Sequence, residues 1–175
     1  MENDSAVTRS RKSLRPALWH WCLLVTILFA GSLRFIGLDW DEGRHLHPDE
    51  RFLTMVEVAL QWPADSVGFF DESESTLNPR NVGFGFFAYG TFPLFLVKAV
   101  SIQTGMSGYD QVYLVGRFLS GLFDLGTVVL LFLFGWRLYD DRRVGLLAAA
   151  FYAVAVLPIQ HAHFFVVDSF STFFT

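Results

Sequence analysis

The chain alternates between apolar stretches of membrane-spanning length and shorter polar segments. The first apolar stretch, Ala17–Gly37, is long enough to cross about 30 Å of hydrocarbon at roughly 1.5 Å per residue. Two more, Leu114–Leu138 and Val144–His161, are separated only by the polar turn Asp140–Arg143, which is the pattern of a helical hairpin. We therefore predict an all-α integral membrane protein with transmembrane helices at 17–37, 114–138 and 144–161.

The segment between the first two predicted spans, residues 38–113, is acidic and reads as an external loop. Within it, residues 48–62 show apolar positions at helical spacing, which predicts an amphipathic helix on the membrane surface. Residues 84–102 are also apolar, but glycine and proline interrupt their first half and Lys98 polarises the second. This stretch therefore predicts an embedded helix rather than a full span.

Basic residues set the predicted orientation. The tail, residues 1–16, carries four of them, and three arginines cluster around the Asp140–Arg143 turn. Cytoplasmic segments are enriched in Lys and Arg, so both are expected in the cytoplasm. The chain must then cross the membrane an even number of times between them. The predicted spans 17–37 and 114–138 already provide two crossings, so 84–102 is expected to stay outside, with Asp49 and Asp168 on the same face. If 84–102 crossed instead, the membrane would separate those two acids.

Composition narrows the class further. Charged residues make up 17% of the chain, below the roughly 25% usual for soluble domains, while 53% are hydrophobic. A net charge of −4 argues against a nucleic-acid partner. Cys22 is the only cysteine, which excludes an intramolecular disulfide. A signal peptide is the rival interpretation of the first apolar stretch, but its length and Arg34 favour a span.

Residues 169–175 begin another apolar segment at which the sequence stops. They are interpreted as the start of a next span, so the chain is expected to be the amino-terminal portion of a longer protein.

The sequence His47-Pro48-Asp49-Glu50 places two carboxylates just beyond the first span. A carboxylate there is a candidate general base for an acceptor hydroxyl or amine. Helix capping is the structural alternative for Asp49.

Arg117 lies early in an otherwise apolar predicted span. An arginine at membrane depth is costly and usually has a partner or a ligand. Three alternatives stay open: a buried carboxylate such as Glu50 or Asp124, a lipid phosphate that the guanidinium would bind bidentately, and snorkelling to the interface.

The end of the third predicted span carries His161, His163 and Asp168. Two histidines and a carboxylate could bind a metal, although their spacing is not that of a known zinc site, so the metal question stays open. Asp168 is either a helix cap or a second functional acid, and Ser169 is another candidate for the cap. Tyr89 lies in a stretch that contains glycine and proline, which predicts an irregular, defined backbone conformation there.

Taken in order, these motifs resemble the amino-terminal module of polyprenyl-phosphate-dependent membrane glycosyltransferases of the C-type fold. The similarity is greatest to bacterial relatives of the protein O-mannosyltransferases and the lipid A aminoarabinose transferases. It extends over nearly the whole chain after Leu14 and rests on these segments: His47-Pro48-Asp49-Glu50, Tyr89-Gly90-Thr91-Phe92-Pro93, Gly116-Arg117-Phe118-Leu119-Ser120, Thr127 to Leu138, Gly145 to Ala150, Pro158-Ile159-Gln160-His161 and Asp168.

The resemblance implies a multi-span helical bundle in a bacterial inner membrane. It also implies inverting transfer of a sugar from a polyprenyl-phosphate donor to a protein, lipid or glycan acceptor outside the cytoplasm. The essential acid of that family falls on Asp49 with Glu50 adjacent, the second acid on Asp168, and the donor-phosphate arginine on Arg117. His47, Tyr89 and His163 are supporting candidates, and a divalent metal is left open. The alternative class is a membrane transporter or assembly subunit without glycosyl transfer.

Overall fold

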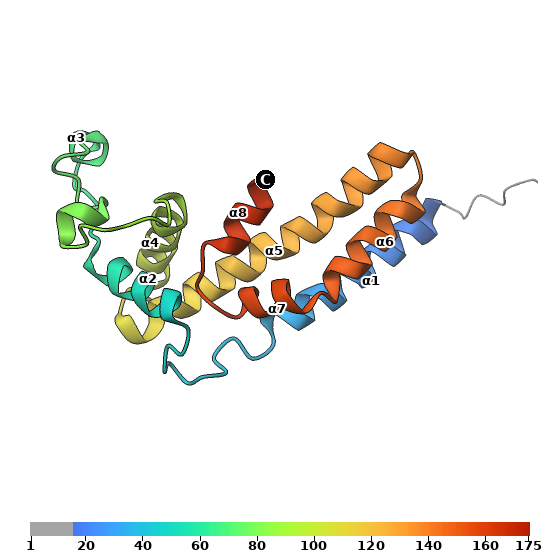
Figure 1. Ribbon diagram of the computed structural model, residues 1–175, viewed down its shortest axis with the longest axis horizontal. Helices are drawn as coiled ribbons and strands as arrows, with labels where there is room; N and C mark the ends of the chain where they lie inside the picture. Colours follow the sequence, from blue (N-terminus) through green and yellow to red (C-terminus); the bar gives the residue numbers. More distant parts are fainter. Residues whose placement is uncertain (1–15) are drawn as a thin grey trace, which may run out of the picture.

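The computed structural model describes residues 16–175 of the chain, and its architecture is a bundle of long helices with a smaller helical cap at one end (Figure 1). Within that range every regular element is a helix, so the all-α prediction is confirmed there. The predicted cytoplasmic tail, residues 1–16, lies outside the described residues except for Pro16, which opens the first helix.

Three helices lie side by side and form the bundle: α1 (Pro16–Phe35), α5 (Tyr109–Tyr139) and α6 (Arg142–Ala153) (Figure 1). Two of them, α1 and α5, are long and apolar enough to cross a membrane. At 1.5 Å per residue, the 31 residues of α5 extend about 46 Å, well beyond a hydrocarbon core of about 30 Å. The helix also begins at Tyr109, ahead of the predicted Leu114, and its first turns pack within the cap.

The third predicted span is not one straight helix. Residues 144–161 divide between α6 and α7 (Val156–Ala162), which meet at a bend of 60°. Pro158 explains the break, because it has no N–H to donate to the carbonyl of Val154 and its ring would collide with that turn. Residues 16–175 therefore contain two candidate spans, or three if the bent pair crosses as one.

The cap is built from α2 (Pro48–Ala59), α3 (Ser66–Phe70), the 3₁₀ helix η1 (Pro79–Val82) and α4 (Phe92–Thr104). The amphipathic helix predicted over 48–62 ends at Ala59, where Leu60 turns to extended backbone. The predicted embedded helix begins at Phe92 rather than at residue 84.

Glycine accounts for the late start of α4, since Gly83 and Gly90 adopt positive φ angles of 101° and 77°. These are angles that glycine adopts readily and that interrupt a right-handed helix.

A buried apolar core joins α2, α4 and the start of α5 to the last segment of the chain, α8 (Asp168–Phe174). Its fully buried members include Leu53, Val56, Leu94, Val97 and Phe165. This core fixes the cap to one end of the bundle and positions the loops between them.

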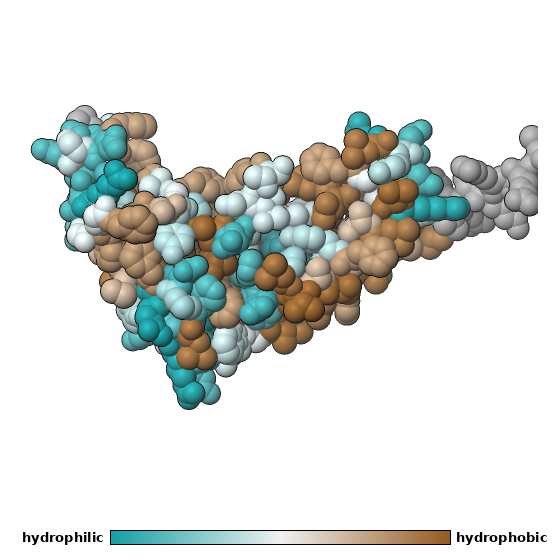
Figure 2. Space-filling model, in the orientation of Figure 1, coloured by the Kyte–Doolittle hydropathy of each residue, from teal (hydrophilic) through white to brown (hydrophobic). Residues whose placement is uncertain are grey.

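The outside of the bundle is apolar where a bilayer would contact it. Along α1, Trp21, Val25 and Leu28 are each more than 60% exposed. Figure 2 shows hydrophobic side chains over the long helices, with hydrophilic side chains gathered on the cap and at the opposite end of the bundle. Such a belt between two polar ends is typical of a membrane protein.

Candidate functional site

A fully buried arginine stands where the cap meets the bundle. The Nε and Nη2 atoms of Arg117 donate to the two carboxylate oxygens of Glu50 at 2.7 and 2.6 Å. Nη2 also donates to Asp41 at 2.9 Å, and the guanidinium lies 4.7 Å from the ring centre of Tyr113. Both Arg117 and Glu50 are 0% exposed, so this is a desolvated bidentate ion pair.

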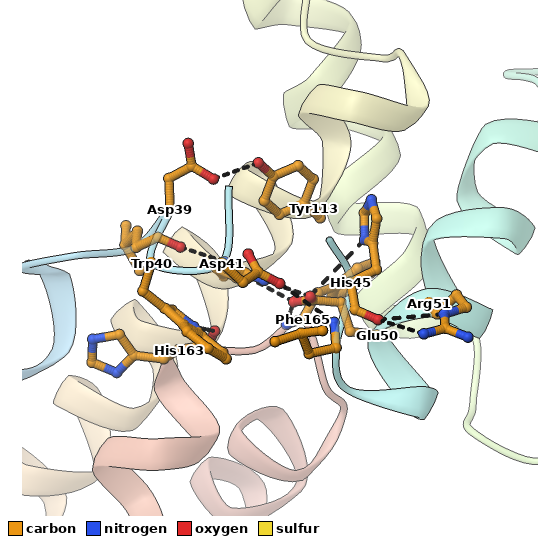
Figure 3. Close-up of polar contacts among 12 residues, drawn as sticks. Asp39, Trp40, Asp41, His45, Glu50, Arg51, Tyr113, His163 and Phe165 are labelled. Atoms are coloured by element: carbon orange, nitrogen blue, oxygen red, sulfur yellow. Dashed lines mark hydrogen bonds and ion pairs between the residues drawn. The ribbon is translucent and has the colours of Figure 1, made fainter. Parts of the chain in front are cut away.

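Glu50 connects three parts of the chain. Besides binding Arg117, its Oε2 accepts the backbone N–H of Phe165 at 2.7 Å, and His45 Nδ1 lies 4.0 Å from its Oε1. Figure 3 shows the side chains of Asp41, His45 and Glu50 converging with the backbone of Phe165 at this point. The ion pair therefore joins α2 and α5 to the segment that leads into α8.

The loop between α1 and α2 is held along its length by the same cluster. Arg117 Nη1 donates to the carbonyl of Leu38 at 2.5 Å, and Tyr113 donates to Asp39 at 2.6 Å. Arg51 donates to the carbonyl of His45 from both Nε and Nη2. Burial alone would raise the pKa of Asp41, but the hydrogen bond and charge of Arg117 outweigh it and lower that pKa. This loop leads directly into Asp49.

These contacts change the roles expected of two predicted site residues. Arg117 has a carboxylate partner, which was one of the three alternatives, and neither its burial nor its bonding leaves the guanidinium open to a donor phosphate. Glu50 is equally enclosed, so it has no access to a substrate. The geometry assigns both residues to positioning the loop rather than to contact with substrate.

Asp49, by contrast, is only partly buried, and it forms no ion pair within the described part of the chain. Its Oδ1 accepts a hydrogen bond from the Tyr89 hydroxyl at 3.0 Å. Burial raises the pKa of Tyr89, as do this hydrogen bond and the charges of Asp49 and Asp168. Asp168 is exposed at the start of α8. The structure brings together Asp49 and Tyr89 from two separate segments.

The histidines serve the structure in different ways. The ring of His163 contacts the carbonyls of Ile36 and Ile159, which ties α7 to the end of α1. The ring of His47 packs against Phe164 with centroids 4.6 Å apart. Among residues 16–175 no group of three His, Cys, Asp or Glu side chains could hold a metal ion. His161 and His163 therefore form no metal cluster with Asp168 in this structure.

Sequence reasoning missed a second buried charge cluster, which lies inside the bundle. Arg34 Nε bonds to Asp124, and Tyr152 donates to the other oxygen of Asp124 at 2.7 Å. Arg34 also donates to the carbonyls of Tyr152 and Ala153 at the bend after α6, where Tyr152 additionally accepts the backbone N–H of Ala155 at 3.1 Å. Arg34 therefore helps to cap the broken helix, and Pro158 in the sequence was the available signal for the break.

Two open cavities lie in the cap, and they share Glu72, Asn78 and Thr91. The first measures about 310 Å³ and is lined by Arg80 and by Ala88 and Gly90, the neighbours of Tyr89. Arg80 is exposed and forms no ion pair within the described part of the chain, so it is a cation that a ligand could reach.

The site is thus a half-buried carboxylate in the first turn of α2, which follows a firmly held loop and accepts a hydrogen bond from Tyr89. Comparisons of the chain with protein-family models, with curated proteins and with solved structures find no match. The chemistry open to this site is proton transfer by Asp49, in the first turn of the cap helix α2 that packs against the bundle helix α5.

Proposed function

We propose that this chain transfers a sugar from a polyprenyl-phosphate donor to an acceptor on the extracytoplasmic face of the membrane, with inversion at the anomeric carbon. The observation that carries the proposal is the position of Asp49. It is partly exposed, it accepts a hydrogen bond from Tyr89, and it lies in the first turn of α2, at the boundary where the cap packs against α5 of the apolar bundle. A donor with a lipid tail and a polar head needs a site at that boundary.

In this proposal Asp49 is the general base, and the residues around it position its carboxylate. Asp49 accepts the proton of the acceptor hydroxyl or amine while the acceptor attacks the anomeric carbon on the face opposite the phosphate. The bond from that carbon to the phosphate oxygen breaks, and the lipid phosphate leaves. Tyr89 fixes the orientation of the Asp49 carboxylate. Arg117 and Glu50 are positioning residues, because they hold the loop and the helix start that carry Asp49.

Transport is the second candidate function, and one observation favours it. Asp124 and Arg34 form a buried pair within the bundle, and buried charges in membrane helices commonly mark ion or substrate pathways. However, Arg34 also satisfies the carbonyls at the bend in the helix, which gives the pair a structural role.

The test is sugar transfer by the full chain in membranes supplied with undecaprenyl-phosphate sugars carrying a radiolabelled hexose or aminopentose. We expect transfer by the unmodified chain and a loss of about 10²–10⁴-fold in Asp49→Asn, the usual contribution of a general base. Glu42→Gln is the matched control, since Glu42 is an exposed acid of the same loop that pairs only with Arg44. Full turnover by a folded Asp49→Asn protein would show that Asp49 is not the general base. Labelled substrate that crosses the membrane without transfer would favour transport.

A further inference from the structure

A small basic and aromatic cleft lies at the end of the bundle opposite the cap. Figure 1 shows the start of α1 beside the turn that joins α5 to α6 at this end. The cleft has a volume of about 50 Å³, and side chains from all three helices line it: Trp19, His20, Leu23, Phe132, Trp136 and Arg142. It is therefore separate from the candidate active site, which lies at the cap.

Two arginines contact one of the aromatic rings at this cleft. The guanidinium carbon of Arg142 lies 4.5 Å from the ring centre of Trp136, and that of Arg137 lies 5.8 Å from it. Neither arginine forms an ion pair within residues 16–175. A contact with the face of an aromatic ring uses the charge of a guanidinium but none of its N–H donors. The ring therefore holds Arg142 in place and leaves its donors for an acceptor outside the protein.

The two aspartates of the adjoining turn do not neutralise these arginines. Asp141 is the N-cap of α6, and its Oδ1 accepts the backbone N–H of Arg143 at 2.9 Å. Asp140 is exposed, and neither aspartate forms an ion pair with a described arginine. Three arginines against two aspartates leave this end of the described chain positive. Its charge therefore suits an anion.

The surroundings of the cleft are those of a membrane interface. Two of its lining side chains are tryptophans, which concentrate at the level of lipid headgroups. Figure 2 shows hydrophilic side chains at this end, next to the apolar side chains of the long helices. One turn deeper into the bundle, the exposed Leu24 follows His20 on α1, and Leu146 follows Arg142 on α6. An anion held by Arg142 would therefore have apolar surface directly beside it.

We propose that this cleft binds the headgroup phosphate of an anionic phospholipid, whose acyl chains lie along the apolar surface of α1 and α6. Arg142 donates to the phosphate oxygens, Trp136 fixes the guanidinium, and Arg137 adds a second positive charge. A cleft of about 50 Å³ is too small for a whole lipid, so only the phosphate enters it. Basic pockets between transmembrane helices are known to bind such headgroups. This site requires neither sugar transfer nor a role for Asp49.

The experiment measures lipid binding to the full chain, released from dodecyl maltoside micelles, by native mass spectrometry. The probes are dioleoylphosphatidylglycerol, which is anionic, and dioleoylphosphatidylcholine, which is zwitterionic and has the same acyl chains. Arg142→Gln removes the charge, and Arg142→Lys keeps the charge but not the planar set of donors. Arg143→Gln is the matched control, because Arg143 belongs to the same turn, is exposed, and contacts neither the cleft nor Trp136.

We expect the anionic lipid to bind the unmodified chain at least about fivefold more tightly than the zwitterionic one, the effect of one cation at a charged headgroup. Arg142→Gln should abolish this preference and Arg142→Lys should reduce it, whereas Arg143→Gln should change it by less than about twofold. Both Arg142 variants should keep the unfolding temperature of the unmodified chain, since Arg142 forms no buried ion pair in the described chain.

Three results would overturn the proposal. The first is an unmodified chain that binds the two lipids equally. The second is an equal loss in Arg142→Gln and Arg143→Gln, which would show a general attraction to the basic turn rather than a site at the cleft. The third is displacement of the anionic lipid by an equal concentration of glycerophosphoglycerol, its water-soluble headgroup, which would show a site for free anions.

Discussion

Arg117 and Glu50 lie at the centre of the molecule, yet they act on Asp49 only through the chain between them. A buried ion pair contributes little net stability, but removing one partner leaves the other charge desolvated. Here that partner also holds Asp41 and the Leu38 carbonyl, so one arginine organises the whole loop between α1 and α2. Its position early in a span left three alternatives open for Arg117, and choosing the buried carboxylates among them required the fold.

Replacing Arg117 tests this positioning role. Arg117→Met should lower the free energy of unfolding by about 3–5 kcal/mol, because Glu50 and Asp41 would remain buried without a cation. Thermal unfolding in detergent measures it, with the exposed Arg44→Met as the control. The double variant Arg117→Met, Glu50→Met should recover part of the loss. A stable Arg117→Met protein that has lost only donor binding would instead restore the phosphate-binding role.

Glu57 provides a pH-dependent prediction. It is 0% exposed, both of its carboxylate oxygens lack hydrogen-bond partners, and burial raises its pKa from 4.5 to about 8 against the opposing charge of Lys98. Between these two values the folded protein holds a proton that the unfolded chain has released. The free energy of unfolding should therefore fall as the pH rises from about 5 to 7.5.

The matched variant for that series is Glu57→Gln, which stays neutral at every pH. Its thermal stability should depend less on pH over the same range, and it should exceed that of the unmodified chain most clearly at the upper end. Parallel pH profiles for the two proteins would show that Glu57 is ionised in the fold throughout this range.

At the scale of the elements, hydropathy patterns located the helices better than their ends. Residues 114–138 fall within α5, and 17–37 match α1 apart from the last two residues, because a long apolar run has few other ways to satisfy its backbone in a bilayer. The late start of α4 and the break between α6 and α7 depend instead on single glycine and proline positions, which average hydropathy conceals. The pairing of Asp49 with Tyr89 could not be predicted from spacing, since two separate segments supply them.

The contact between α5 and α6 depends on two glycines. A Cβ added to Gly135 would lie 2.8 Å from the Gly145 Cα, and one added to Gly145 would lie 2.9 Å from the backbone nitrogen of Trp136. Gly145→Ala should therefore separate the helices and cost about 1–3 kcal/mol of stability, seen as a lower unfolding temperature. Gly85→Ala is the control, because a Cβ there has no atom within 4 Å and should change nothing. Equal unfolding temperatures for the two variants would contradict the close packing.

At the scale of the whole molecule, the proposed function requires both acids, Asp49 and Asp168, to lie at the same end of the bundle. The hydrogen bonds from Phe165 to Glu50 and from Trp40 to His163 join the segments that carry Asp168 and Asp49. The turn between α5 and α6 lies at the opposite end (Figure 1). If α1 and α5 cross the membrane, the acids share one face and the turn lies on the other, and the proposed function requires the face of the acids to be extracytoplasmic.

Labelling of single cysteines in intact cells with a membrane-impermeant maleimide tests this most directly. In a Cys22→Ser background, Leu46→Cys, Asp168→Cys and Tyr139→Cys mark the two ends of the bundle at exposed positions. We predict that the first two label in intact cells and that Tyr139→Cys labels only after the membrane is permeabilised. Labelling of Leu46→Cys and Asp168→Cys from opposite sides would contradict the shared site, and labelling of Tyr139→Cys alone in intact cells would place that site in the cytoplasm.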